Sequence, residues 1–545
     1  MALPQNVKIF RRPLSHRPVS AGIAVWRKLS LPILSCLLSV GGCLNESGVD
    51  PSSYPYAADG KVSFSESETL IVPRYGTVDI ILHSEKEFKA KGDISPFTDI
   101  NVQAVVWTPG GRRFHVDGFF DGDGAGGSNG HVFKIRLCPD TEGWWSWEIL
   151  SGLSELHGKG GRILCRGSLP GLFARGPIIV HPKHSRFFST ADGTPLYLMA
   201  KFLDEAAPEP IQFSHTFFSE QVIDADREEM LARHRRMKCN RLDIYLANRG
   251  DYGGIQTTPW SEKKLKEGQV VFNLSYWRMY EHWLRRLRDA DMAAHIWFFA
   301  DDSDFGKLPL EQRLELIRYG MARLSGFVNT IFVVCLEWEE GWSRKEVEVA
   351  GRVTQEANPW SRLVSVHGTP GDFDYPESDW ADYLIIQPGN KADYDSVYTL
   401  GLTNRGAAAK PLLNEEFSLG GEDDAGRIKA WCALFAGGAG SGTGAFLPPL
   451  SDFISAVPYT ALEPLAGMVV RGKAYLLGER GRELLAYLPE GDEVEINLHD
   501  FPGIWRVTWF DPRKGDWTAL DPVPGGATQL FRPLGEGDWA LRLVP

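Results

Sequence analysis

The segment "KPLLNEEFSLGG", residues 410–421, decides how the middle of this chain is interpreted. Its apolar run, 411–413, ends abruptly in Asn414, Glu415 and Glu416, and no cationic residue stands beside the two acids. A carboxylate that loses its water is costly unless it is paired, so an acid at the end of a buried strand points to a site. We therefore expect this segment to be a strand that ends in functional carboxylates.

Strand-length apolar runs alternate with amphipathic helical patterns on both sides of this segment, between residues 185 and 465. Eight strands in βα alternation over about 280 residues predict a (β/α)8 TIM barrel. A doubly wound sheet is the alternative, but no glycine-rich phosphate loop follows the first strand. The strand candidates are 195–200, 239–247, 293–299, 330–336, 362–368, 382–389, 410–417 and 440–446.

Short alternating runs broken by Gly, Pro and Asp flank the barrel on each side. Residues 61–170 predict a β-sandwich, in which Trp145 and Trp147 lie on one strand face and belong to the core. Residues 470–545 predict a second, small C-terminal β-sandwich. The expected architecture is multidomain: a β-sandwich, a barrel at 185–465 and a small C-terminal β-sandwich.

The N-terminus has the pattern of a targeting segment. Basic residues precede a short apolar run, and Gly41 and Gly42 stand before Cys43, as in a bacterial lipobox. We expect residues 1–43 to be a signal peptide with a lipobox, Cys43 to be lipidated, and residues 44–60 to be a tether. The expected location is the bacterial cell envelope, periplasmic or cell-surface, with the membrane reached through the lipid. An ordinary cleaved signal, and hence a secreted protein, is the alternative.

Charge and composition exclude several classes of protein. The net charge of -12 disfavours nucleic acid as a partner, and 43% hydrophobic residues with 18 Trp indicate a globular chain. The five cysteines after the signal lack CxxC spacing, although Cys138 and Cys165 could pair. The acidic run 301–304 lacks a calcium-loop spacing. We expect no metal and no organic cofactor.

The fourth strand candidate also ends in acids. "FVVCLEWEEGW" supplies Glu337, Glu339 and Glu340 beside two Trp residues. Because the strand ends of a barrel converge on one face, acids at the fourth and seventh strands come together there. A retaining glycosidase needs such a pair, one acid as nucleophile and one as acid/base, about 5 to 5.5 Å apart. Carbohydrate is therefore the expected substrate.

"KPLLNEEFS" resembles the "KPxxxxEFG" seventh-strand ending of a large clan of β/α-barrel glycosidases, and the match falls on Glu416 as nucleophile. The fourth-strand pattern of that clan is Asn-Glu, which puts the acid/base on Glu339 and leaves Trp338 where Asn is expected. If the strand ends earlier, Glu337 points inward instead, because alternate residues face the same side.

Motifs in all three parts are similar to those of one family of bacterial glycoside hydrolases. They include "SPFTDINVQAVVWTPGGRRFHVDGFFDG", "STADGTPLYLMA", "KPLLNEEFS" and "WRVTWFDPRKGDW". The resemblance implies an N-terminal Ig-like domain, an apiosidase-like barrel and a C-terminal β domain sometimes labelled collagen-binding. "KFLDEAAPE" after the first strand departs from the "GDTAW"-like ending of the family, so the sugar contacts there are expected to differ.

Further polar and aromatic residues stand at strand ends, where they could bind sugar hydroxyls or stack under a ring. A structural polar or core role is the alternative for each, and for Asp243 that alternative is an ion pair with Arg241. The candidates are Asp243, Tyr245, Trp297, Asp301, Trp338, His367, Gln387 and Glu415.

Two functions remain open from the sequence. The first is a glycoside hydrolase acting on a plant or microbial polysaccharide or oligosaccharide. The second is a non-catalytic glycan-binding lipoprotein with a degenerate barrel, which Trp338 and the altered first loop favour. A peptidase, which the collagen label brings to mind, lacks an HExxH helix and a GxSxG turn.

Overall fold

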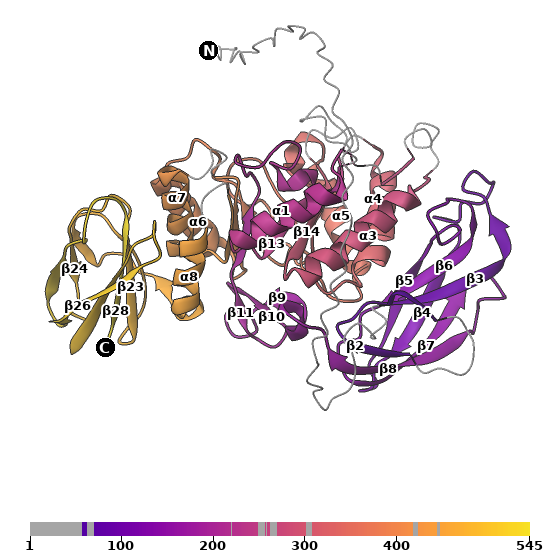
Figure 1. The fold of residues 1–545 in the computed structure, drawn as a ribbon, viewed down its shortest axis with the longest axis horizontal. Coiled ribbons are helices and arrows are strands. Elements are labelled where there is room, and N and C mark those ends of the chain that lie inside the picture. The colour runs from indigo at the N-terminus through magenta and orange to yellow at the C-terminus, as the bar shows by residue number, and fades with distance from the viewer. Residues whose placement is uncertain are drawn as a thin grey trace, which may run out of the picture. The chain divides into compact units, whose positions relative to one another are not determined.

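A computed structural model describes residues 57–62 by their backbone, and then 70–219, 221–248, 257, 259–261, 270–300, 308–417, 423–443 and 447–545. The long C-terminal unit of the fold begins at Asp50, and all the elements described below belong to it. They run from an all-β region through a helix-rich region to a second all-β region (Figure 1). Cys43 and Asp301 lie outside the described residues.

The first β region has the strand order β1-β3-β6-β5-β4-β7-β8-β2. Strand β5 joins its two halves, because its first residues pair with β4 and residues from Gly118 onward pair with β6. Gly118 is required there, since a Cβ would lie 2.7 Å from the Ile135 side chain and 2.8 Å from the Val102 carbonyl. The strands are β1 (Ala57–Val62), β2 (Ile71–Arg74), β3 (Val78–Phe88), β4 (Val102–Trp107), β5 (Arg113–Phe120), β6 (Gly130–Leu137), β7 (Gly143–Ser151) and β8 (Gly160–Ser168).

The core of this region agrees with the alternation of its strands. Trp145 and Trp147 lie on β7 and are both buried, so their assignment to the core is confirmed. Cys138 and Cys165 are buried but unpaired, so the possible disulfide between them is not formed. The Cys138 sulfur instead accepts a hydrogen bond from the Arg362 guanidinium at 3.2 Å.

A small antiparallel sheet, β9 (Ile178–Val180), β10 (Phe188–Thr190) and β11 (Pro195–Leu196), leads into the barrel region. Eight parallel strands follow, one at each predicted position, in two sheets with the orders β12-β19-β18-β17 and β13-β14-β15-β16. They are β12 (Leu198–Lys201), β13 (Arg241–Ala247), β14 (Ala293–Phe299), β15 (Thr330–Val333), β16 (Val364–Ser365), β17 (Leu384–Ile386), β18 (Leu412–Glu415) and β19 (Gly440–Thr443).

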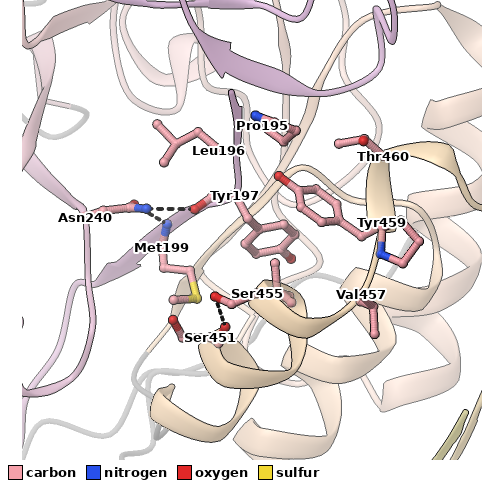
Figure 2. Close-up of a pocket in the computed structure, with 12 residues that line it drawn as sticks. Pro195, Leu196, Tyr197, Met199, Asn240, Ser451, Ser455, Val457, Tyr459 and Thr460 are labelled. Atoms are coloured by element: carbon pink, nitrogen blue, oxygen red, sulfur yellow. Dashed lines mark hydrogen bonds between the residues drawn. The ribbon is translucent and has the colours of Figure 1, made fainter. Parts of the chain in front are cut away.

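Hydrogen bonds at both junctions bring the two sheets together into a nearly closed barrel. At one junction the Asn240 side chain accepts from the Met199 amide and donates to the Tyr197 carbonyl, both at 2.9 Å (Figure 2). At the other, the Asp382 amide donates to the Val364 carbonyl at 2.8 Å. The eight strands thus lie in the order that a barrel requires, and their carboxyl ends share one rim.

Helices alternate with the strands, except that a non-helical segment, 366–383, joins β16 to β17. Helix α3 shows why the sequence folds in this way: Asn273 caps its first turn, and Trp277, Tyr280 and Leu284 are buried on one face. The helices are α1 (Asp224–Arg236), α3 (Leu274–Asp289), α4 (Leu310–Leu324), α5 (Arg344–Glu356), α6 (Tyr394–Ala407), α7 (Asp424–Phe435) and α8 (Pro448–Ala456).

The second β region consists of two antiparallel sheets, with the orders β20-β22-β23-β28-β25-β26 and β21-β24-β27. Trp505, Val507 and Trp509 alternate along β25 and are all buried in its core. The strands are β20 (Glu463–Pro464), β21 (Val469–Arg471), β22 (Tyr475–Glu479), β23 (Glu483–Leu488), β24 (Val494–Asn497), β25 (Ile504–Phe510), β26 (Trp517–Pro524), β27 (Thr528–Phe531) and β28 (Trp539–Val544).

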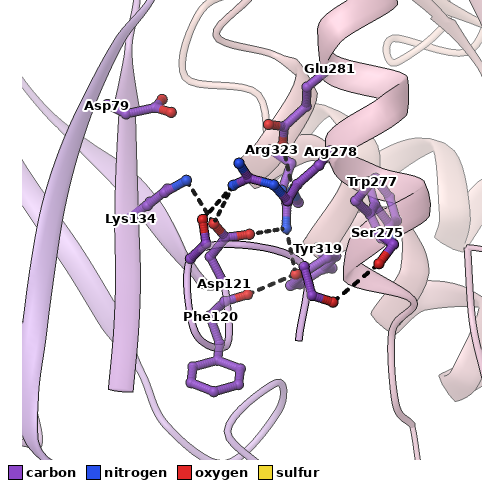
Figure 3. Close-up of polar contacts among 12 residues, drawn as sticks. Asp79, Phe120, Asp121, Lys134, Ser275, Trp277, Arg278, Glu281, Tyr319 and Arg323 are labelled. Atoms are coloured by element: carbon purple, nitrogen blue, oxygen red, sulfur yellow. Dashed lines mark hydrogen bonds and ion pairs between the residues drawn. The ribbon is translucent and has the colours of Figure 1, made fainter. Parts of the chain in front are cut away.

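A buried charge network joins the first β region to helices α3 and α4 (Figure 3). Arg323 of α4 pairs with Glu281 of α3 at 2.6 Å and with Asp121 at 2.9 Å. Arg136 of β6 pairs with the same Glu281 at 3.0 Å. Lys134 of β6 pairs with Asp121 at 2.6 Å. Each of these charges is buried, so each depends on its partners in place of water.

Candidate active site

The ends of β15 and β18, the fourth and seventh barrel strands, carry the acids that the sequence singled out. Glu416 follows β18 directly, and Glu337 is the fourth residue after the end of β15. Both have a left-handed backbone, with φ of 48° and 38°. A residue other than glycine in this region costs on the order of 1–3 kcal/mol, and such strain is concentrated at functional sites.

Glu416 is half-buried and is fixed by two neighbouring strands. Its amide donates to the Gly442 carbonyl of β19 at 3.0 Å. Its Oε2 accepts a hydrogen bond from Nε2 of Gln387 at 2.6 Å, and Gln387 directly follows β17. The structure thus brings together two of the predicted site residues, one as a carboxylate and the other as the donor that orients it.

The two acid/base candidates differ in their surroundings. Glu337 is half-buried at the start of a short 3-10 helix, Trp338–Glu340. Glu339 is exposed in that helix, and its Oε2 accepts from the Thr369 amide at 2.9 Å. The Trp338 indole donates to Oδ2 of Asp374 at 3.2 Å. Glu337 therefore lies closest to the strand end, while Glu339 and Trp338 contact the loop after β16.

A buried polar layer lies among the barrel strands, built around the Arg241 guanidinium of β13. Arg241 Nη2 lies 2.6 Å from Oε1 of Glu415, and its Nε lies 3.0 Å from Oδ1 of Asp243. His295 Nδ1 lies 2.6 Å from the same Asp243 oxygen, and its Nε2 lies 2.8 Å from the Tyr383 hydroxyl. Asp243 and Glu415 are only 0% and 1% exposed. The ion pair with Arg241 is thus formed, and both acids are enclosed by protein rather than presented to solvent.

The small size of Gly442 makes room for this layer. A Cβ at that position would lie 1.7 Å from Oε2 of Glu415 and 2.9 Å from Nη2 of Arg241. Larger residues would therefore force the carboxylate off its arginine. The fold places this glycine on β19, beside Glu415 on β18.

Burial and neighbouring charges shift the pKa values of the two acids in this layer in opposite directions. Burial raises the pKa of Glu415 to about 8, against the effect of Arg241. Burial acts on Asp243 too, but Arg241 and His295 hold the pKa of that carboxyl well below its usual range. Burial lowers the pKa of His295 to about 4. Near neutral pH the layer therefore consists of Arg241 as cation, Asp243 as anion, and neutral Glu415 and His295.

Asp243, His295 and Glu415 are also residue types that bind metals, and one ligand atom from each lies within 4.8 Å of the others. The Arg241 guanidinium already contacts both carboxylates of this group. A divalent ion there would lie against a fixed positive charge. The donor set therefore does not fit a resident cation, and the group is better described as a hydrogen-bonded network around the Arg241–Asp243 ion pair.

Aromatic rings surround Trp297 of β14. The ring centroids of His215, Tyr245 and His367 lie 5.0, 5.5 and 5.5 Å from that of the indole. Burial lowers the pKa of His215 to about 4 and that of His367 to about 3, so both imidazoles are neutral near pH 7. Nε2 of His215 and both ring nitrogens of His367 have no hydrogen-bond partner among the described residues.

These neutral imidazoles can donate to, or accept from, a neutral hydroxyl group. His367, Tyr245 and Trp297 were predicted, and the structure brings them together. His215 was missed, because it lies in a short 3-10 helix, Ser214–Phe218, after the first strand. Its only sequence signal is a histidine inside the aromatic run "FSHTFF".

No helix among the described residues has the length and apolarity needed to cross a membrane.

Comparison with known proteins supports the fold. The family model described as "Domain of unknown function (DUF5060)" matches residues 71–152, and that described as "Putative collagen-binding domain of a collagenase" matches residues 463–543. None of the curated proteins matches the sequence significantly.

Three solved structures illustrate the likeness. A "putative glycoside hydrolase" from Bacteroides vulgatus superposes with a TM-score of 0.69 at 17% identity, over 87% of this chain and 99% of that one. A glycoside hydrolase family 5 protein from the same organism gives 0.57 at 13% identity, over 68% and 94%. A "glycoside hydrolase" gives 0.55 at 13% identity, over 68% and 97%. The expected resemblance is confirmed: the structural neighbours are glycoside hydrolases, and the chain has their fold.

Proposed function

We propose that this protein is a glycoside hydrolase that cleaves a plant or microbial polysaccharide or oligosaccharide. The observation that carries the proposal is the pair of half-buried glutamates, Glu337 and Glu416, at the ends of the fourth and seventh strands. Both have left-handed backbones, which a folded protein keeps only where the surrounding structure enforces them. Acids from these two strand ends face the same rim of the barrel.

We assign Glu416 as the nucleophile, because Gln387 orients its carboxylate and because it is more accessible than Glu415. Attack of Glu416 on the anomeric carbon would form a glycosyl-enzyme ester as the leaving oxygen takes a proton from the acid. The same acid, now a base, would then remove a proton from the water that hydrolyses the ester. The product would retain the anomeric configuration.

Glu337 is the better candidate for the acid/base. Glu337 lies nearer the end of β15 than Glu339 does and is less exposed, so it is better placed to meet a glycosidic oxygen at the rim. The Glu339 carboxylate instead accepts a backbone hydrogen bond from Thr369. That bond commits the Glu339 carboxylate to the loop after β16, which suits a structural or sugar-binding role.

The surrounding residues can hold a neutral sugar. His215, Tyr245, Trp297 and His367 are themselves buried, so this cluster forms a floor beneath the rim, and its imidazoles would bind only a sugar hydroxyl that reaches that floor. Trp338 lies at the rim beside Asp374, where it can flank a sugar ring. The Arg241, Asp243 and Glu415 layer would keep the strand ends in register rather than touch the substrate.

The test is hydrolysis of plant oligosaccharides and aryl glycosides by the mature protein beside Glu416→Gln, Glu337→Gln and Glu339→Gln. Loss of activity by orders of magnitude in the first two, with native circular dichroism, would support the assignment. Retained activity in Glu337→Gln with loss in Glu339→Gln would move the acid to Glu339. NMR that identifies the anomer formed first tests whether the anomeric configuration is retained.

A non-catalytic glycan-binding protein is the second candidate. Trp338 stands where the related glycosidases place an asparagine, and the Glu339 side chain is bonded to the loop after β16. Binding of an oligosaccharide that is never cleaved, unaffected by Glu416→Gln, would favour this candidate.

We also propose that the protein is held at the bacterial cell envelope by a lipid on Cys43. The basis is the lipobox-like Gly41, Gly42 and Cys43 after an apolar run. Metabolic labelling with radioactive palmitate should mark the protein, and Cys43→Ser should abolish the label and release the protein from the membrane fraction. Label that survives the substitution would contradict the anchor.

A further inference from the structure

Strand β7 carries tryptophans on both of its faces. Trp145 and Trp147 point into the core of the first β region, whereas Trp144 lies on the opposite face and is 43% exposed. Successive side chains of a strand point to opposite faces, so Ser146 and Glu148 share the outer face with Trp144, and both are exposed. The neighbours of β7 in the sheet are β4 and β8 (Figure 1). A single exposed tryptophan is common, so its neighbours decide whether this face is a site.

A row of four residues crosses the outer face from strand to strand. Arg113 of β5 lies opposite Trp107 of β4. Trp107 in turn lies opposite Ser146 of β7, which lies opposite Arg162 of β8. Adjacent strands are about 4.8 Å apart, so the backbones of the two arginines are separated by three such steps, roughly 14 Å. The row is therefore longer than one sugar ring.

Each arginine of this row lies over a tryptophan. The guanidinium carbon of Arg162 is 4.4 Å from the centre of the Trp144 ring, and that of Arg113 is 5.8 Å from the centre of the Trp107 ring. Both arginines are exposed, and neither guanidinium has a hydrogen bond or an ion pair with any residue that the structure describes. The rings thus hold two guanidiniums in place and leave their N–H donors open to an anion.

The acids on this face do not neutralise the arginines. Trp144 and Glu148 lie on opposite sides of the row along β7, so Arg162 leans toward the ring and away from the acid. Glu142, just before β7, accepts a hydrogen bond from a backbone amide of β8 at 3.0 Å. Arg166, exposed on the same face of β8 as Arg162, adds a third cation. The end of the face around Trp144 therefore presents open positive charge on a chain whose net charge is -12.

We propose that this surface, the Trp144 face, binds a polysaccharide that carries carboxylate groups. It consists of Trp107, Arg113, Trp144, Ser146 and Arg162. The apolar side of a pyranose ring packs on the exposed part of a tryptophan, and the carboxylate of that sugar meets the neighbouring guanidinium, whose planar fork matches a carboxylate. Because the row is longer than one ring, it suits successive acidic units of a chain.

The anionic character of the partner follows from the open arginines, whereas its being a polysaccharide rests on the proposed function. A second contact of this kind would hold the polymer on the enzyme and raise its local concentration at the barrel. Exposed charges are screened by salt, so binding to the Trp144 face should weaken as the salt concentration rises.

The experiment measures binding of polygalacturonate and alginate, each beside its esterified form, to the mature protein by isothermal titration calorimetry. Esterification removes the negative charge and keeps the sugar ring. All proteins carry Glu416→Gln, so that hydrolysis does not consume the polymer. The test variant combines Arg113→Gln with Arg162→Gln. The matched control combines Arg480→Gln with Arg482→Gln, which removes two charges from exposed side chains of the second β region.

At least one acidic polymer should bind, and its esterified form should bind roughly 10-fold more weakly or worse, because a hydrogen bond to a charged group is lost. The test variant should weaken binding of the acidic polymer by roughly 10-fold or more. Trp144→Ala should weaken it by roughly 2- to 10-fold, through the loss of the ring contact. The control should leave binding unchanged, and every variant should keep the native circular dichroism spectrum.

Binding of neither polymer, equal binding of the esterified form, or an equal loss in the control would overturn the proposal. Dextran sulfate, double-stranded DNA or vesicles of anionic phospholipid that bind the Trp144 face as tightly as the acidic polysaccharide would also overturn it, because the surface would then recognise charge alone. The assay requires no cleavage, and Glu337 and Glu416 lie on the barrel rim. Failure here therefore leaves the hydrolase proposal standing, and a protein that hydrolyses nothing could still bind through this face.

Discussion

Replacement of Arg323 by methionine should destabilise the protein far more than its position outside the active site would indicate. Arg323 is 0% exposed and carries two ion pairs, to Glu281 at 2.6 Å and to Asp121 at 2.9 Å. Its Nη1 also donates to the Tyr319 hydroxyl at 2.9 Å. The substitution keeps the apolar volume but leaves two buried carboxylates short of a cation.

The size of the effect follows from what remains. Removing one partner of a buried pair costs about 3–5 kcal/mol when the other charge is left alone. Here Glu281 keeps Arg136 at 3.0 Å and Asp121 keeps Lys134 at 2.6 Å. We therefore expect the lower end of the range, about 3 kcal/mol. Arg136→Met combined with Arg323→Met strips Glu281 of both cations and should cost more than the sum of the single changes.

The assay is urea denaturation of the mature protein, followed by tryptophan fluorescence and far-UV circular dichroism. Arg318→Met is the matched control, because Arg318 pairs with Glu311 on the same helix at 2.8 Å but both side chains are exposed. The control should change stability by less than about 0.5 kcal/mol. A loss below about 1 kcal/mol for Arg323→Met would refute the reasoning that the network is dry and that its charges depend on one another.

Three further predictions concern the barrel. Burial raises the pKa of Glu415 from 4.5 to about 8, so the stability that its protonated form contributes is complete below about pH 4.5 and is lost as pH rises through 8. Glu415→Gln should flatten this decline in melting temperatures measured against pH. An unchanged slope would contradict the prediction. Gly442→Ala should lower the free energy of unfolding by about 1–3 kcal/mol, because the new Cβ meets the Glu415 carboxylate. The control Gly406→Ala, whose Cβ would have nothing within 4 Å, should be neutral or slightly stabilising. Equal effects of the two variants in urea titration would be evidence against the clash. His367→Phe should lower kcat/KM by roughly 2- to 10-fold, the value of one neutral hydrogen bond. The profile of kcat/KM against pH should neither gain nor lose an inflection near pH 6.5, because burial lowers the pKa of His367 to about 3 and keeps the imidazole neutral. Loss of an inflection there would show that the histidine titrates.

The strands of the barrel were predictable because each is a short apolar run between turn signals. Every one of the eight predicted positions contains a strand, including β16, which has only two residues. The sequence could not show which acid belongs to the end of the fourth strand. Glu337 and Glu339 are two residues apart, so an extended chain would point both side chains to the same face. The strand ends at Val333, and the left-handed backbone at Glu337 starts the 3-10 helix that carries Glu339, which gives the two acids different surroundings.

The buried polar contacts were out of reach for a physical reason. Arg241 and Asp243 stand inside an apolar run, and nothing local shows that Glu415 lies across the barrel from them. The charges of the interface come from β3, β6, α3, α4 and the turn after β5, so only the tertiary fold brings them together. The same holds for His215, whose neighbours Tyr245 and Trp297 come from other strands.

The most direct measurement of the central claim is the time course of hydrolysis of a panel of neutral oligosaccharides by the mature protein and by Glu416→Gln. The account predicts that at least one glycosidic bond is cleaved and that Glu416→Gln lowers the rate by orders of magnitude while the protein stays folded. Cleavage that persists at the same rate in Glu416→Gln, or a protein that binds glycan and cleaves nothing, would contradict it.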